Sequence, residues 1–66
     1  MHITINGESN EYPGPPILCE LLSFLGIDPS KVAVERNLKI VPRSRIDGEA
    51  VEPGDVFEII RLVGGG

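Results

Sequence analysis

The sequence predicts a two-layer α+β fold, with one amphipathic helix lying across a mixed sheet of roughly four to five strands. Segments with a period of two, typical of strands, occur near both ends and in the middle of the chain. Only residues 16–26 show the period of a helix. The length of 66 residues, without repeats or a linker, indicates a single domain spanning residues 1–66.

The first expected element is a strand over residues 1–6, with Ile3 and Ile5 on one face. Asn6 and Gly7 follow, and both tolerate positive φ, which predicts a two-residue hairpin turn. The returning strand covers residues 9–12. The proline-rich residues 13–16 end it, because proline donates no hydrogen bond to a sheet.

Residues 16–26, PILCELLSFLG, predict the helix. Four leucines at i, i+3, i+4 and i+7 form a single apolar stripe: Leu18, Leu21, Leu22 and Leu25. Pro16 suits the first helical position, and Gly26 suits the left-handed residue that closes the last turn. Ile27 is then expected to fold back onto the helix end, before a turn at residues 28–30.

A third strand is expected over residues 32–37, where Val32 and Val34 share a face. A short loop at Asn37 and Leu38 returns the chain into a fourth strand over residues 39–41. Pro42 ends that strand.

Residues 42–54 are irregular, and we expect Ile46 and Val51 to attach this segment to the core. Glu52 and Asp55 flank a Pro-Gly turn, with Asp55 accepting backbone hydrogen bonds. The last strand is expected over residues 55–63.

The register of the last strand points to a partner site. Phe57 and Ile59 are expected to face the helix, which leaves Glu58, Ile60 and Leu62 on the outer face. The opposite register would bury Glu58 in a small core, where an unpaired charge is costly. An exposed apolar patch is typical of a docking surface. The alternative is that residues 42–54 cover it.

Composition excludes several kinds of site. With one cysteine and one histidine, Cys19 and His2, the chain can form neither an intramolecular disulfide nor a Cys/His zinc site. The lone thiol and the absence of a signal-peptide pattern favour a cytoplasmic protein, and no apolar run is long enough to span a bilayer. Ten acidic residues against six basic ones, a net charge of −4, argue against nucleic-acid binding.

The sequence shows no group of residues that suggests a catalytic acid, base and nucleophile. Cys19 is interpreted as a small hydrophobic residue of the helix, the alternative being a semi-exposed thiol of low pKa. His2 is expected to be solvated. Arg61 would lie on the face of Phe57 and Ile59, where it either extends its charge to water or pairs with an acidic partner.

Gly64, Gly65 and Gly66 follow the last strand directly. Lacking Cβ atoms, they would form a thin, flexible arm that fits a narrow slot and ends in a carboxylate. An enzyme that binds the neighbouring patch could draw this arm into its active site. The alternative is a frayed terminus.

These features together resemble the ThiS family, sulfur-carrier proteins of thiamine thiazole synthesis with the β-grasp fold of ubiquitin. The resemblance covers the whole chain and rests on INGE, ELLSFLGI, VAVERNLKIVPRS, EPGDVFEIIRLV and the terminal glycines. The chain departs from the family at Leu38, where members often have glycine, and at the proline-rich residues 13–16.

The resemblance implies a protein cosubstrate rather than an enzyme. A ubiquitin-activating-enzyme-like (ThiF-like) adenylyltransferase would use ATP to adenylate the carboxylate of Gly66, while Gly64 and Gly65 thread its active site. Persulfide sulfur from a cysteine desulfurase would displace AMP and leave a thiocarboxylate, which a ThiG-like thiazole synthase takes up. The carrier itself would bind no cofactor and no metal.

Two alternatives remain open from the sequence. One is the small subunit of molybdopterin synthase, which uses the same tail. The other is a β-grasp interaction module whose tail is never activated. The short length and the combination of VAVERN with VPRS favour the thiazole carrier.

Overall fold

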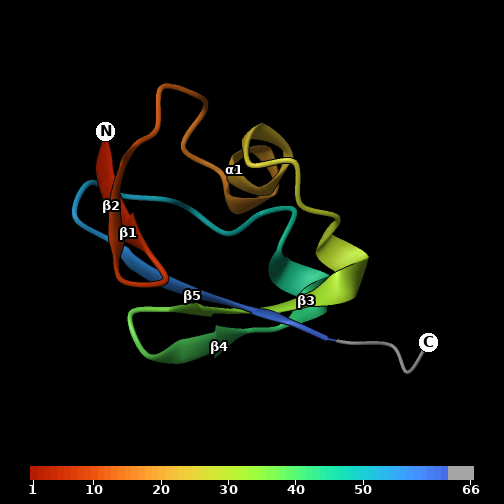
Figure 1. The fold of residues 1–66 in the computed structure, drawn as a ribbon. Coiled ribbons are helices and arrows are strands. Elements are labelled where there is room, and N and C mark those ends of the chain that lie inside the picture. Colours follow the sequence, from red (N-terminus) through yellow and green to blue (C-terminus); the bar gives the residue numbers. More distant parts are fainter. Residues whose placement is uncertain (63–66) are drawn as a thin grey trace.

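The computed structural model describes residues 1–62, which form a five-stranded mixed sheet and one α-helix. The strands are β1 (His2–Ile5), β2 (Glu8–Glu11), β3 (Val32–Arg36), β4 (Lys39–Val41) and β5 (Val56–Arg61). The helix is α1 (Leu18–Phe24), and two short 3₁₀ turns are η1 (Pro29–Lys31) and η2 (Arg43–Arg45). The predicted two-layer α+β fold is therefore confirmed, with α1 on one side of the sheet (Figure 1).

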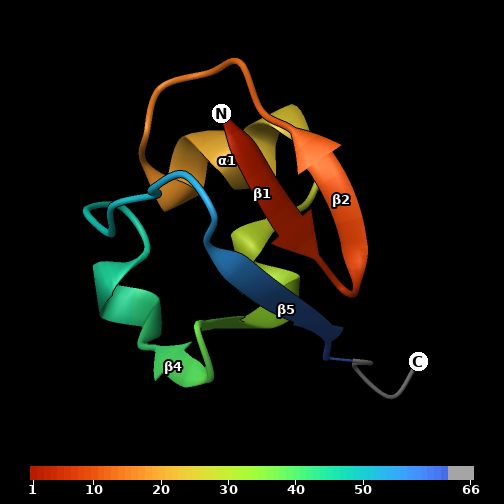
Figure 2. The same ribbon diagram turned by 90° about the vertical axis from the view of Figure 1, so that its left-hand side faces the viewer.

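The last strand lies at the centre of the sheet, whose order is β2-β1-β5-β3-β4. It runs parallel to β1 and antiparallel to β3, so it joins two hairpins that are far apart in the sequence. Figure 2 shows β2, β1 and β5 side by side. Both predicted hairpins are present, with Asn6 and Asn37 at positive φ in their turns.

The core lies between α1 and the sheet. Leu18, Leu21 and Leu22 of the predicted stripe are fully buried, whereas Leu25 is only half-buried at the end of the helix. They pack with inward residues of the strands and of the segment 42–54: Ile3, Ile5, Val32, Val34, Val41, Ile46, Val51 and Phe57. The expected attachment of Ile46 and Val51 to the core is thus confirmed.

The start of the helix differs from the prediction. α1 begins at Leu18, with Ile17 as an extended N-cap residue, so Pro16 is not the first helical position. The reason lies in a distant segment: the Pro16 carbonyl accepts a hydrogen bond from Val51 N (3.0 Å), and Leu18 N donates to Glu49 O (2.8 Å). These bonds hold Ile17 extended against Ala50, which delays the helix by two residues.

The end of the helix follows the prediction. Gly26 has φ of 72°, and its N–H donates to Ser23 O. Ile27 N donates to Leu22 O, and the Ile27 side chain packs against the core. This pair of hydrogen bonds is the Schellman arrangement, in which a left-handed glycine closes the last turn.

Candidate docking face at the end of the last strand

The first half of β5 is paired on both sides, and the second half is held on the β3 side as far as Leu62. Backbone pairing with β1 reaches Phe57, while pairing with β3 continues to Arg61. Beyond it, Leu62 N donates to Lys31 O at 2.9 Å. The predicted tail residues Gly64, Gly65 and Gly66 lie outside the described residues. What the structure defines is the surface immediately before them.

That surface has the predicted register. Phe57 is fully buried and Ile59 half-buried beneath the helix layer. Glu58, Ile60 and Leu62, here named the outer patch, are exposed on the opposite face, with Ile60 and Leu62 each 47% accessible. Half-accessible Ile and Leu side chains on one sheet face leave apolar area available to a partner.

The segment 42–54 does not cover the outer patch, so that alternative is wrong. Its apolar residues Ile46 and Val51 turn into the core instead. At one side Leu62 borders a shallow hollow together with Pro42, Arg43 and Ile46. The outer patch is therefore flanked by this segment and stays open to solvent.

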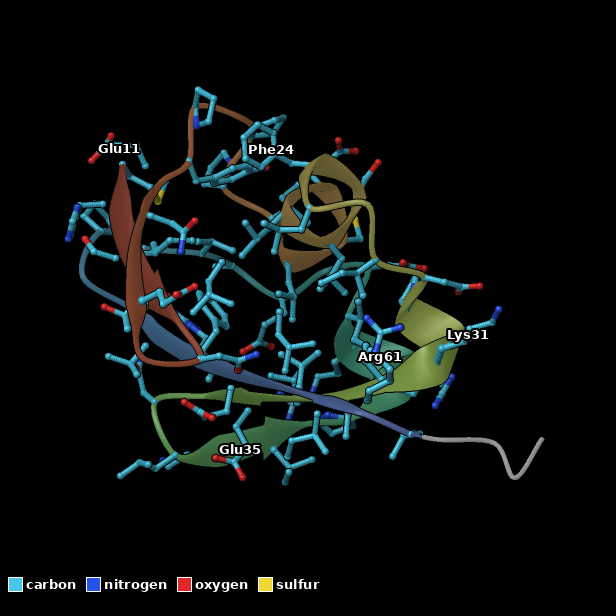
Figure 3. The ribbon with its side chains drawn as sticks, viewed as in Figure 1. Glu11, Phe24, Lys31, Glu35 and Arg61 are labelled. Carbon is cyan, nitrogen blue, oxygen red and sulfur yellow. The ribbon has the colours of Figure 1, made fainter. Side chains whose placement is uncertain are left out.

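Arg61 lies on the helix-side face, as predicted, and it is exposed. Figure 3 shows Arg61 and Glu35 on opposite sides of the sheet. Arg61 borders hollows with Ile27, Val32 and Ile59, beside the end of the helix. Among residues 1–62 it forms no ion pair, which agrees with a long side chain that extends its charge to water.

A cluster around Arg36 positions the start of β5. Arg36 Nε donates to Asp55 Oδ2 at 2.8 Å, and its other nitrogens reach Glu52 Oε1 (3.0 Å) and Glu49 Oε2 (3.3 Å). Asp55 also accepts hydrogen bonds from Asn37 Nδ2 (3.0 Å) and from Glu52 N (2.8 Å). The predicted turn role of Asp55 is confirmed, but it is one part of a larger charge network.

The electrostatics of this cluster follow from its contacts. Burial disfavours the carboxylate of Asp55, but hydrogen bonds from Asn37, Glu52 N and Arg36 outweigh burial and lower the pKa of Asp55. The hydrogen bond to Asp55 is the main reason that the pKa of Arg36 is raised. The role of Arg36 is not predicted from the sequence. The available signal was three acids at positions 49, 52 and 55, together with an arginine near the end of a predicted strand.

Cys19 and His2 have ordinary surroundings. The Cys19 thiol is partly buried and lies 3.7 Å from Asp47 O, consistent with its interpretation as a helix packing residue. His2 is exposed, with Nε2 2.7 Å from Ser9 Oγ and Nδ1 3.3 Å from Glu11 Oε1. Within residues 1–62 no group of three His, Cys, Asp or Glu side chains could hold a metal ion.

None of the helices described in residues 1–62 is both long and apolar enough to span a membrane.

Comparisons with known proteins agree with this geometry. The crystal structure of a thiamine biosynthesis protein (ThiS) from Geobacter metallireducens superposes with a TM-score of 0.85 and 33% identity, covering all of both chains. Two proteins named thiazole synthase match the whole chain, at 47% identity in Paramagnetospirillum magneticum and 38% in Magnetococcus marinus. The chain spans 20% of the length of each of these two relatives.

The structural match confirms the predicted β-grasp fold. The sequence model of the ThiS family matches residues 3–66, nearly the whole chain and including the terminal glycines. The chain therefore belongs to the ThiS family.

Proposed function

We propose that this protein is a sulfur carrier for thiazole formation in thiamine biosynthesis, acting through a thiocarboxylate at Gly66. The observation that carries the proposal is the family match over residues 3–66, which includes the glycines. The occurrence of an equivalent segment in two proteins named thiazole synthase supports a thiazole synthase as the partner that receives the sulfur. It also favours the thiazole pathway over molybdopterin synthesis.

The chemistry begins with a poor electrophile. A carboxylate does not exchange oxygen for sulfur, because oxide is a poor leaving group. An adenylyltransferase resembling ubiquitin-activating enzymes joins the Gly66 carboxylate to the AMP part of ATP and releases pyrophosphate. The terminal sulfur of an enzyme persulfide, supplied by a cysteine desulfurase, displaces AMP, and a thiol then reduces the resulting S–S bond to release the thiocarboxylate.

In this scheme the folded domain supplies docking and the tail supplies the reacting group. In the outer patch, Glu58 and Ile60 lie on β5 and Leu62 directly follows it, shortly before Gly64 and Gly65 in the sequence. Binding a partner there offsets the entropy lost when glycines are ordered in an active site. The carrier binds neither ATP nor a metal in this proposal; ATP is used by the partner.

The direct test is intact-mass measurement after incubation with the adenylyltransferase and cysteine desulfurase of the same genome, ATP and cysteine. Replacement of oxygen by sulfur adds about 16 Da. A variant lacking Gly66 is expected to keep its Tm and to acquire no sulfur. Absence of the mass gain in the unaltered chain, with active partner enzymes, would contradict the proposal and favour an interaction module with an unactivated tail.

The docking role of the outer patch has its own test. Leu62→Asp is expected to raise the Kd for the adenylyltransferase at least about tenfold, because a charge is placed in an apolar contact. Leu38→Asp is the matched control, since Leu38 is 88% accessible on the turn that joins β3 and β4. If Leu62→Asp lowers Tm together with the affinity, Leu62 stabilises the fold rather than the complex.

A further inference from the structure

The outer face of the sheet carries two carboxylates on neighbouring strands. In the antiparallel pairing of β3 with β5, Glu35 lies directly opposite Glu58. Residues so paired have Cβ atoms about 5 Å apart, and like charges there destabilise a sheet. Among residues 1–62 neither carboxylate forms an ion pair. Within these described residues no ion pair offsets the repulsion, so an external cation would make the arrangement favourable.

Apolar side chains surround the acidic pair. Across the sheet, Ile40 of β4 lies opposite Glu35, so Ile40, Glu35 and Glu58 form one row. The next row along β5 pairs Ala33 with Ile60. Ile40 is 60% accessible and Ile60 47%. Outward positions of an antiparallel sheet are normally polar, so two exposed isoleucines beside paired acids are unusual for a solvated face.

We propose that the Glu35–Glu58 pair, with Ile40 and Ile60 beside it, receives an arginine side chain of the partner adenylyltransferase. This inference rests on the proposed function and names the chemistry of the docking contact. Two adjacent carboxylates offer several acceptor oxygens, which suit the five N–H donors of a guanidinium. Its flat, weakly hydrated face also packs against aliphatic side chains, which an ammonium group does less well.

The cluster around Arg36 shows the same chemistry satisfied inside the chain. There one guanidinium contacts the carboxylates of Glu49, Glu52 and Asp55. On the outer face, no guanidinium group of residues 1–62 pairs with the carboxylates of Glu35 and Glu58. The net charge of −4 adds a long-range attraction for a basic partner surface.

The test compares E35Q/E58Q with the unaltered chain, using the adenylyltransferase of the same genome as the probe. We expect the double variant to raise Kd about tenfold at low salt and to weaken the dependence of Kd on NaCl concentration. Its Tm should be equal or higher, because the like-charge contact is gone. Loss of affinity with no loss of Tm is a combination that a structural role would not produce.

E8Q is the matched control, since Glu8 is an exposed glutamate on the far edge strand β2; it should leave Kd unchanged. In the sulfur-transfer assay the double variant should raise KM and leave kcat unaltered. An unchanged Kd in E35Q/E58Q, with normal sulfur loading of the unaltered chain, overturns the arginine contact and leaves the proposed function standing. Absence of loading in the unaltered chain overturns both.

Discussion

The turns of the two hairpins have similar backbone conformations and differ in their second residue. Each turn begins with an asparagine in the left-handed region, Asn6 with φ of 50° and Asn37 with φ of 52°. The second turn residue is Gly7 in the first hairpin, with φ of 81°, and Leu38 in the second, with φ of 70°. Leucine rarely adopts positive φ, because its Cβ approaches the neighbouring carbonyl oxygen.

Both asparagines also bind the central strand. Asn6 Oδ1 accepts from Ile59 N at 2.7 Å, and Asn37 Oδ1 accepts from Val56 N at 2.9 Å. The amide groups donate to Ile59 O (3.3 Å) and to Asp55 Oδ1 (3.0 Å) respectively. Each side chain therefore continues the sheet where its own strand turns away. Asn37 has the stronger set, because one of its partners is a carboxylate.

The first residue of each turn therefore attaches its hairpin to the central strand. A leucine at the second position is tolerated because Asn37 and the Arg36 cluster hold the hairpin against β5. Leu38 itself contributes little, being 88% accessible. The strain at Leu38 is thus offset by its neighbours and not by its own contacts.

The largest expected effect is that of Asn37→Ala. The variant loses a hydrogen bond to Val56 N and one to the carboxylate of Asp55, about 3 kcal/mol of unfolding free energy in total. Asn6→Ala loses two bonds to Ile59 and should cost about 1–2 kcal/mol. Urea denaturation of both variants measures the difference. Equal losses of unfolding free energy in the two variants would mean that the Asp55 carboxylate adds nothing to the hydrogen bonds of Asn37.

The next largest effect is a pH dependence of the difference in unfolding free energy between Asn37→Ala and Asn6→Ala. Hydrogen bonds from Asn37, Glu52 N and Arg36 outweigh burial and lower the pKa of Asp55 in the folded state. A lowered folded pKa stabilises the fold above the unfolded value of about 3.9, and this contribution is lost as pH falls through the folded pKa.

Lowering the pH from neutral to about 2 should therefore reduce the unfolding free energy lost in Asn37→Ala. The loss in Asn6→Ala should stay unchanged. The second variant is the control, because its partners on Ile59 do not titrate. A cost of Asn37→Ala that stays constant over this range would refute the role given to Asp55.

The smallest effect concerns the second turn position. Leu38→Gly relieves about 1–2 kcal/mol of left-handed strain, but glycine also raises the conformational entropy of the unfolded chain. The free energy of unfolding should therefore rise by about 0.5–1 kcal/mol. Gly7→Leu should lower it by a similar amount. Thermal denaturation of the two single variants tests both signs. A lower Tm for Leu38→Gly would mean that Leu38 makes a stabilising contact.

Most local structure could be predicted because it depends on short-range patterns. The alternation of Ile3 with Ile5, the leucine stripe of the helix and the left-handed Gly26 each follow from residues within a few positions of one another. The outward register of Glu58, Ile60 and Leu62 followed from a single cost, that of burying an acid. Their exposure is confirmed, while their docking role and that of Gly66 stay predictions.

The errors lie where distant segments meet. The helix begins after Pro16 because residues 49–51 take the hydrogen bonds of residues 16–18. This contact between distant segments leaves no periodic signal in the sequence.

Local residue patterns are enough to predict the helix and the strands, both hairpin turns, the apolar face of each element and the family. The position of β5 between β1 and β3 appears only in the folded molecule, and it joins Arg36 to Asp55 and sets Glu35 beside Glu58. The physical reason is that periodicity and turn conformations are properties of neighbouring residues. Strand order and side-chain pairs depend instead on which distant segments bury their apolar faces together.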